Sequence, residues 1–261
     1  MTMEKGVPIR AITRGLSVLQ AVNRGGSITM MEIARTSQVP YPTACRIVQT
    51  LLHEGMIERE PARKRYRATA LVQSLASGYH DDSKLVEIAR PHIEALTDKL
   101  LWPISITSRV GAHMMVRDST HTRTSLTLNN YYPGFTLPIM ECSSGKAYMA
   151  FCSDGEREHL LEGLRTIEGA AEKMATLLLS NDSLLREVRN QGYATQSRNA
   201  YTANPGKTSS IAVPIFRGEE VAGAITIIFF SVAMPMEKAI SQFVAPVTET
   251  ARAISRELSA L

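Results

Sequence analysis

Residues Thr29–Gly55 read TMMEIARTSQVPYPTACRIVQTLLHEG and predict two short helices joined by a turn. Thr29 and Glu32 have the spacing of a capping box, in which a hydroxyl and a carboxylate satisfy the first free amides of a helix. Val39-Pro40 predicts the turn that follows. Pro42 suits the first turn of the second helix, because the amides of that turn have no partner inside the helix.

The second of these helices combines a buried stripe with a polar face. Its apolar side chains recur at helical spacing, at Ile47, Val48, Leu51 and Leu52. The opposite face is predicted to present small or hydrogen-bonding side chains and one arginine: Thr43, Ala44, Arg46, Gln49 and Thr50. Small side chains let a helix approach a DNA groove, and a guanidinium can contact a guanine edge or a phosphate. We therefore predict a recognition helix in which Thr43, Ala44, Arg46 and Gln49 contact DNA.

The flanking sequence completes a DNA-binding fold. A third helix is predicted before the pair, over Ile9–Asn23, and a hairpin after it, around the turn Pro61–Lys64. Three helices and a hairpin form a winged helix-turn-helix. We expect Arg14 in the first helix to contact DNA, and Arg63, Lys64 and Arg65 at the tip of the wing to follow the phosphate backbone. A module that binds only protein is the less favoured alternative.

The charge distribution agrees with a polyanionic partner for this part of the chain. Residues 1–80 contain 11 Lys+Arg and 5 Asp+Glu, a balance of +6, whereas the remainder contains 18 against 20, a balance of −2. Excess positive charge confined to one domain favours nucleic-acid binding. A solvated basic surface would produce the same balance and stays open as an alternative.

The rest of the chain predicts a second domain of the α+β class. Helical spacing continues from Thr69 to Tyr79 and from Ser83 to Leu101, with Pro91 as an expected kink. Strands are then predicted at 103–108, 113–117, 124–128, 210–216 and 221–230, and helices at 144–152, 154–164, 181–191 and 236–258. This mixture favours helices packed on a sheet. We assign 1–78 to the winged helix-turn-helix, 79–101 to a linker helix, and 102–261 to the second domain.

Compartment and cofactor expectations follow from what the sequence lacks. It has no apolar run of the roughly 20 residues that span a bilayer and no apolar signal region near its first residue, so we expect a cytoplasmic protein. Cys45, Cys142 and Cys152 show no CxxC spacing, which favours free core thiols over a disulfide or zinc site. No GxGxxG, P-loop, HExxH or GxSxG motif is present, so we expect neither catalysis nor a cofactor or metal.

Motifs along nearly the whole chain resemble the IclR family of transcriptional regulators. They are Ile9–Leu19, Pro40, Thr43, Arg46, Thr50-Leu51, Glu54–Ile57, Tyr66, Ser144–Ala147, Gly192-Tyr193 and Ser209–Ile215. Four further segments are similar to the MhpR-like branch, whose members activate hydroxyphenylpropionate degradation: Leu101–Pro103, Met115–Arg117, Ser119–His121 and Ala150–Cys152. The resemblance implies a GAF-like sensor domain, an activator of aromatic-acid catabolism, and a homodimer or dimer of dimers. Pro42 stands where the family usually has a polar residue, which puts a hydroxyl–phosphate contact there in doubt.

The resemblance also implies an effector site between the Ser143–Gly145 loop and the strand that starts at Thr208-Ser209-Ser210. Free amides at a helix N-terminus favour an anion, so we predict that the carboxylate of an aromatic acid docks on Ser143, Ser144 and Gly145. The ring could be flanked by Trp102, Met115, Leu126, Leu128 and Ile211, although core packing is the alternative for most of them. Arg109, Arg117 and Arg198 are further carboxylate candidates, with structural ion pairing as their alternative.

Three classes of function are compatible with this sequence. The leading hypothesis is a ligand-responsive regulator that binds operator DNA as a dimer and activates transcription, with RNA polymerase as a further candidate partner. An IclR-type repressor of another catabolic operon is its close alternative. The other two hypotheses are an enzyme acting on small aromatic acids with an accessory DNA-binding domain, and a DNA-bound interaction module without a ligand.

Overall fold

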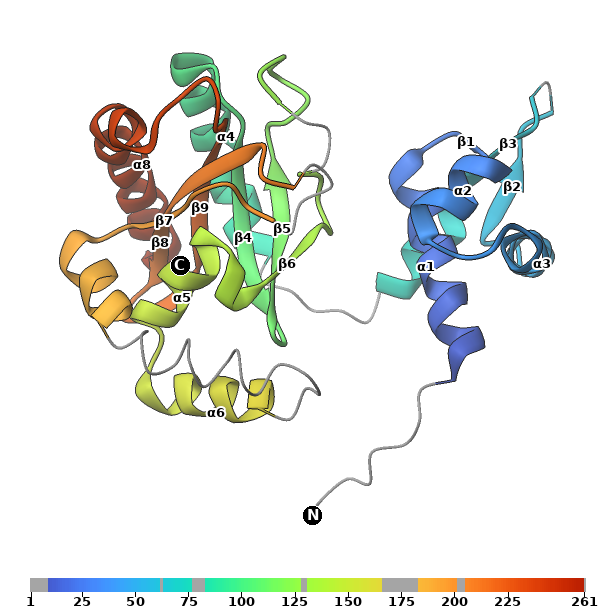
Figure 1. Ribbon diagram of the computed structural model, residues 1–261, viewed down its shortest axis with the longest axis horizontal. Helices are drawn as coiled ribbons and strands as arrows, with labels where there is room; N and C mark the ends of the chain where they lie inside the picture. Colours follow the sequence, from blue (N-terminus) through green and yellow to red (C-terminus); the bar gives the residue numbers. More distant parts are fainter. Residues whose placement is uncertain are drawn as a thin grey trace. The chain divides into compact units, whose positions relative to one another are not determined.

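The computed structural model describes residues 9–61, 63–76, 83–127, 131–165, 183–200 and 205–260. The chain divides into two units, Met1–Asp81 and Asp82–Leu261 (Figure 1).

The first unit is a winged helix-turn-helix, as predicted. Its elements are α1 (Arg10–Gly25), β1 (Ile28–Thr29), α2 (Met30–Ser37), α3 (Tyr41–His53), β2 (Ile57–Arg59), β3 (Arg65–Ala68) and the 3-10 helix η1 (Ala70–Ala76). The three helices enclose a small apolar core that includes Val18, Val22, Ile33 and Val48. Strand β1, which pairs with β3, was not predicted, because two residues are too few to show a period of two. The sequence pattern also predicted a regular helix from Thr69, where the structure has the tighter η1.

The beginning of α2 shows why the predicted capping box fixes this fold locally. The Thr29 amide donates to Glu32 Oε2 at 2.7 Å, and the Glu32 amide donates to Thr29 Oγ1 at 3.3 Å. The hydrogen bond from the Thr29 amide is the largest of several effects that lower the pKa of Glu32. Arg65 of β3 adds its guanidinium to the same carboxylate at 3.4 Å. The box therefore connects the helix to the wing.

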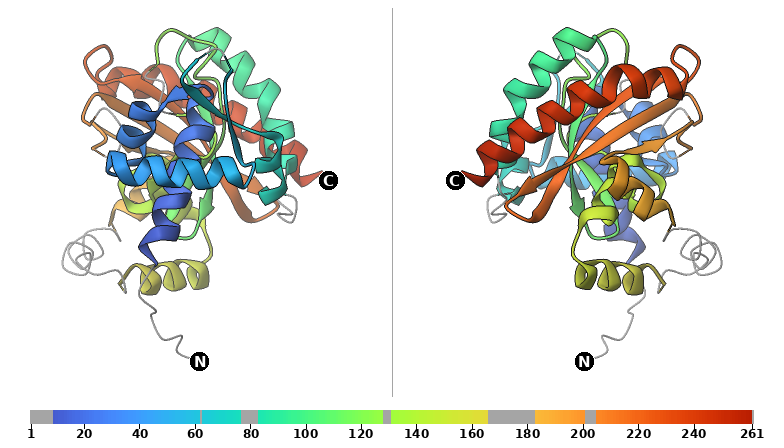
Figure 2. Two further views of the ribbon diagram at one scale, coloured as in Figure 1. Left: turned by 90° about the vertical axis from the view of Figure 1, so that its right-hand side faces the viewer. Right: turned by 90° about the vertical axis from the view of Figure 1, so that its left-hand side faces the viewer.

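The second unit is built on one antiparallel sheet in the order β6-β5-β4-β9-β8-β7. Its strands are β4 (Ile104–Val110), β5 (His113–Ser119), β6 (Thr136–Pro138), β7 (Ala194–Gln196), β8 (Thr208–Arg217) and β9 (Glu220–Phe230). Helices α4 (Ser83–Leu100) and α8 (Met236–Ser259) cover one face, and α5 (Ser143–Phe151) covers the other, preceded by the 3-10 helix η2 (Ile139–Glu141) and followed by α6 (Asp154–Arg165) (Figures 1 and 2). This arrangement confirms the predicted α+β class.

Helix α4, which sequence analysis assigned to a linker, is part of the body of the second unit. Its side chains Leu85, Ala89, Ile93 and Leu96 are buried in the core that α8 and the sheet share. The pairing of α4 with α8 is the main helix–helix contact of this unit. A connector between two domains would expose most of its surface, whereas this helix buries a full stripe.

At the edges of the sheet, several predicted elements differ from those in the structure. Residues 124–127 are not a strand, although their polar and apolar residues alternate. The edge strands β6 and β7 were missed, because three residues are too few to show a pattern. In the predicted helix 181–191, residues 183–191 are helical and the first two lie outside the described residues.

Candidate functional site

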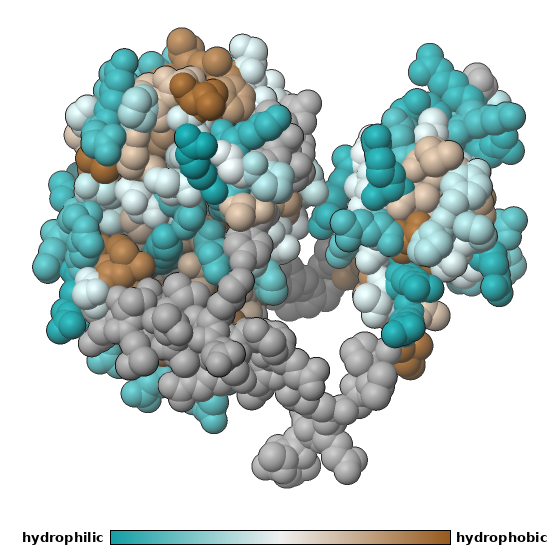
Figure 3. Space-filling view, in the orientation of Figure 1, coloured by the Kyte–Doolittle hydropathy of each residue, from teal (hydrophilic) through white to brown (hydrophobic). Residues whose placement is uncertain are grey.

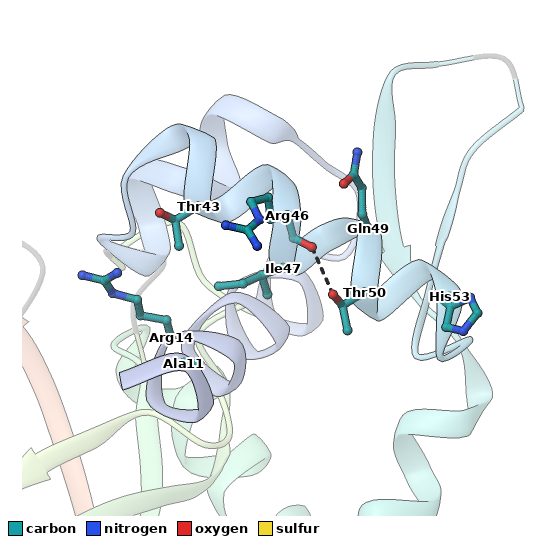
Figure 4. Close-up of a pocket in the computed structure, with 8 residues that line it drawn as sticks. All are labelled: Ala11, Arg14, Thr43, Arg46, Ile47, Gln49, Thr50 and His53. Carbon is teal, nitrogen blue, oxygen red and sulfur yellow. Dashed lines mark hydrogen bonds between the residues drawn. The ribbon is translucent and has the colours of Figure 1, made fainter. Parts of the chain in front are cut away.

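The exposed face of α3 borders a hollow of about 610 Å³ on the first unit. Figure 4 shows Arg14 of α1 and Thr43, Arg46 and Gln49 of α3 around this hollow, with Thr50 donating to the Arg46 carbonyl. Arg46 and Gln49 are exposed. Four predicted residues are thus brought together on one surface. Ala11 and His53, which had no predicted role, also border the hollow, as does Ile47, which was predicted to belong to the buried stripe and is half-buried.

Two residues of the predicted DNA-binding set are placed differently. Ala44 is fully buried in the core of the first unit, because it lies on the same side of α3 as Val48. Arg65 lies at the start of β3, where its guanidinium donates to the Ser27 carbonyl at 2.7 Å as well as to Glu32. Arg63 and Lys64 are exposed at the wing turn, as expected. The available basic side chains of the wing tip are therefore these two.

The two faces of the large sheet differ in chemistry. Toward α4 and α8 the central strands present Ile104, Ile106, Ile211, Ile225 and Ile227, all fully buried. Toward α5 the same strands present hydroxyls, because cross-strand partners share a face and neighbours alternate. The buried hydroxyl residues on this face are Ser105, Thr107, Thr208, Ser210 and Thr226. They lie among the apolar side chains of a second buried core, which includes Met114, Ala212 and Ile228.

Three of these hydroxyls, on Thr107, Thr208 and Ser210, form hydrogen bonds, and the buried hydroxyl of Thr226 has no partner among the described residues. Ser210 Oγ lies 2.7 Å from Ser143 Oγ at the start of α5, and Thr208 Oγ1 lies 3.0 Å from the hydroxyl of Tyr131. Burial raises the pKa of Tyr131 to about 12, so this hydroxyl stays protonated. Thr226 Oγ1 is buried and has no hydrogen-bond partner among the described residues. A buried hydroxyl without a partner costs about 1–3 kcal/mol, which a ligand with a polar group can recover.

The N-terminus of α5 is capped by a sulfur atom. The Gly145 amide donates to Cys142 Sγ at 3.3 Å, and burial raises the pKa of the Cys142 thiol. The first amides of α5, at Ser143 and Ser144, have no carbonyl partner inside the helix. Of the three predicted residues, Ser143 lies beside Ser210, whereas Ser144 Oγ lies 3.4 Å from Cys142 Sγ. The anion-binding role of Ser143, Ser144 and Gly145 stays a prediction.

The predicted ring-flanking residues lie elsewhere. Trp102 packs edge-to-face on Phe229 and Phe230 in the core beside α4 and α8, and Leu126 and Ile211 belong to that same core. Met115 follows Met114, which is buried on the α5 side, so Met115 points to the opposite face. Leu128 lies outside the described residues. The sequence placed these side chains near strands but did not determine which face each one occupies.

Two other candidates have structural partners. Ser209 Oγ accepts from the Arg198 amide and lies 2.9 Å from Ser231 Oγ, away from α5. Arg109 bonds to Tyr148 and forms an ion pair with Glu156 at 3.0 Å, joining β4 to α5 and α6. The alternative of structural ion pairing therefore fits Arg109.

Arg117 and Arg198 were also predicted as carboxylate ligands. Arg117 donates to Ser108 on the neighbouring strand, and Arg198 is exposed with a φ of 46°. Ser108 is not one of the buried hydroxyl residues on the α5 face. The carboxylate role of these two arginines stays a prediction.

Three buried hydroxyls were missed by sequence reasoning. Ser105 and Thr107 alternate with Ile104 and Ile106, and Thr226 stands inside an apolar run. The alternation was interpreted only as the mark of a strand. A polar residue in a strand that is buried on both faces is the signal that could have identified this site.

Membrane spans and metal clusters are both absent from the part of the chain that the structure describes. No helix there is long and apolar enough to cross a membrane. Within the same residues, no group of three or more His, Cys, Asp or Glu side chains could hold a metal ion.

Comparison with protein families identifies the class to which this molecule belongs. Residues 11–61 match the IclR helix-turn-helix domain, and residues 77–256 match the C-terminal domain of bacterial IclR transcriptional regulators. The chain belongs to the IclR family of transcriptional regulators, which confirms the resemblance inferred from its motifs.

Individual relatives agree with this assignment. The DNA-binding transcriptional repressor YiaJ of Escherichia coli is 25% identical over 99% of this chain and 92% of its own length. The regulator BhcR of Paracoccus denitrificans is 25% identical over 82% of this chain and 76% of its own. Among solved structures, an IclR homolog from Microbacterium hydrocarbonoxydans complexed with 4-hydroxybenzoate covers 96% of this chain and 100% of its own, with a TM-score of 0.64 and 22% identity.

Proposed function

We propose that this regulator activates an aromatic-acid degradation operon, of the phenylpropionate type, in response to a small aromatic carboxylate. The proposal of an effector rests on the buried hydroxyl residues on the α5 face of the sheet, among which Thr226 has no hydrogen-bond partner within the described residues. The proposal of DNA binding rests on the surface that Arg14, Thr43, Arg46 and Gln49 form on the first unit. Aromatic specificity is supported by the MhpR-like segments and by the 4-hydroxybenzoate complex of a protein with the same fold.

The control mechanism follows from the position of the effector site. A ligand shifts a conformational equilibrium only when it binds the two states with different affinity. A carboxylate at the α5 N-terminus and a polar group at Thr226 would both be held when α5 lies against the sheet. We therefore infer that the effector stabilises this closed arrangement and thereby changes the regulator's action at the operator.

The experiment that tests this function is fluorescence anisotropy on a duplex from the gene's own upstream region, together with transcription from that promoter in a purified system. We expect salt-sensitive binding and increased transcription with one compound from a panel of phenylpropionates, benzoates and phthalates. If the protein lowered transcription on binding and the compound restored it, the protein would be a repressor; YiaJ is also a transcriptional repressor. Binding no tighter than to random DNA would contradict the proposal.

We further propose that the regulator binds DNA as a dimer through α1. Ile9, which directly precedes this helix, is 65% exposed, Ile12 and Leu16 on the helix are 59% and 55% exposed, and Figure 3 shows hydrophobic surface near the beginning of the helix. One recognition helix reads only a few base pairs, so a two-fold pair is needed for a specific site.

A charged residue among the exposed apolar side chains Ile9, Ile12 and Leu16 should weaken the association of the two copies. Leu16→Glu is expected to weaken dimerisation at least 10-fold, because each copy would place a carboxylate in an apolar contact of about 1.5–3 kcal/mol per side chain. Sedimentation velocity measures the change. Met31→Glu is the matched control, since Met31 is 68% exposed on α2. Equal association in wild type and Leu16→Glu would contradict the dimer surface.

A further inference from the structure

Lys146 carries a positive charge that the described protein does not neutralise. It lies on α5, where Nζ donates to Gln196 Oε1 at 2.7 Å and to the Thr195 carbonyl at 3.3 Å. Both acceptors are neutral groups on β7. Within the described part of the chain, no Asp or Glu carboxylate lies within 4.0 Å of its ammonium group to form an ion pair. Lys146 is half-buried, so water replaces only part of the missing countercharge.

An uncompensated cation in this position is costly. Moving a charge out of water is strongly unfavourable unless an opposite charge accompanies it. Burial lowers the pKa of Lys146, outweighing the opposite influence of Cys142 and Glu141. A ligand anion would supply the missing charge.

Lys146 belongs to the same polar group as the predicted anion site. It lies one turn after Ser143 on α5, a spacing that places both side chains on one side of the helix. Its partner Gln196 is the cross-strand neighbour of Ser210, and Ser210 contacts Ser143. The lysine, the two serines and the first amides of α5 thus converge beside β7 and β8.

The unpartnered hydroxyl marks the other end of the site. Thr226 of β9 is the cross-strand neighbour of Ala212, two residues along β8 from Ser210. With strands about 4.8 Å apart and a rise of about 3.3 Å per residue, the Cα atoms of Gln196 and Thr226 are separated by about 12 Å. Cross-strand partners share a face, so Gln196, Ser210 and Thr226 all belong to the face of the sheet that α5 covers, together with core residues such as Ala212.

We propose that Lys146 is the counter-ion of the effector's carboxylate, bound between α5 and β7, and that Thr226 receives a second polar group at the far end of the ligand. The inference rests on the proposed effector site and specifies its ligand: a hydroxylated aromatic monocarboxylate. The positive charge of Lys146 favours a carboxylate at one end of the ligand, and the hydroxyl of Thr226 favours a hydroxyl group on the ring at the other end.

Calorimetric titration of the full chain tests both ends separately. The probes are 3-(4-hydroxyphenyl)propanoate, 4-hydroxybenzoate, 3-phenylpropanoate and the primary amide of each. We expect Lys146→Met to weaken the binding of the hydroxylated acids about 10- to 100-fold, as for loss of a charge-assisted hydrogen bond, and to change amide binding less than about threefold. Lys238→Met, on the exposed start of α8, is the matched control and should bind like wild type. Melting curves establish that each variant is folded.

Thr226→Val provides the independent second measurement. It keeps the shape of the side chain and removes the hydroxyl, so it should weaken the hydroxylated acids and leave 3-phenylpropanoate unchanged. Equal losses for acid and amide in Lys146→Met, or an unchanged acid affinity, would overturn the counter-ion role. Operator binding without binding of any acid would also overturn it while leaving the DNA-binding function intact. If the wild-type protein did not bind the operator specifically, the proposed function itself would be contradicted.

Discussion

Gly145→Ala is expected to destabilise the second unit by about 3 kcal/mol or more and to abolish the response to effector. A Cβ atom at this position would lie 1.7 Å from the Ile139 carbonyl oxygen and 2.5 Å from its carbon. Both are backbone atoms of η2, whose Ile139 is fully buried, so neither can rotate away. The start of α5 and η2 would have to separate, which would displace Ser143 and Ser144 from Ser210.

A matched glycine in the next helix serves as the control. Gly155, in the first turn of α6, is exposed, and a Cβ atom added there would meet no other atom within 4 Å. Gly155→Ala should leave stability unchanged or raise it by up to about 1 kcal/mol, because alanine favours a helix. Denaturant unfolding of both variants measures the difference. Equal stability of Gly145→Ala and wild type would contradict the close packing of α5 on η2.

Arg46→Ala is expected to reduce affinity for the specific operator about 10- to 100-fold, the usual effect of losing one base-contacting arginine. Arg46 is exposed on α3, forms no ion pair among the described residues, and borders the hollow between α1 and α3. Its guanidinium is therefore available to DNA without breaking a contact within the protein. The fold should be unaffected, because Arg46 is not part of the core.

A salt series shows what Arg46 contacts. Loss of a phosphate contact lowers affinity for all sequences and reduces the salt slope by about 1, whereas loss of a base contact relaxes sequence preference. Arg24→Ala is the control, because it removes the same charge near the other end of α1, away from the hollow. If Arg46→Ala and Arg24→Ala bound the operator as wild type does, the assignment of α3 as the recognition helix would be wrong.

The first unit could be predicted from its sequence because its signals are local. The Thr29–Glu32 capping box and the proline at the start of α3 each act within one turn of helix, and both are present in the structure. The exception is Ala44, whose burial depends on how α3 is rotated against its neighbours. A helical pattern gives that rotation only to within about one residue, and Ala44 lies at the border of the apolar stripe.

The proposed effector site could be predicted only in part, because it depends on the register of the sheet. The α5 N-terminus is a local feature, and its Ser143–Gly145 loop was identified. Which strand residues face it is decided by pairing between β4, β9 and β8, and a shift of one residue reverses every face. Trp102 was therefore predicted to flank the ligand, although it lies on the face that α4 and α8 cover. Thr226 was overlooked, although it lies on the face that α5 covers.

The membership of α4 in the second unit determines how these regulators can exchange parts during evolution. A recombination event that joins a new DNA-binding module to the second unit at Trp102 would remove α4 and expose the core that Leu85, Ala89, Ile93 and Leu96 fill. A crossover before Ser83 would transfer an intact second unit. Viable chimaeras, natural or engineered, should therefore have their junctions ahead of α4.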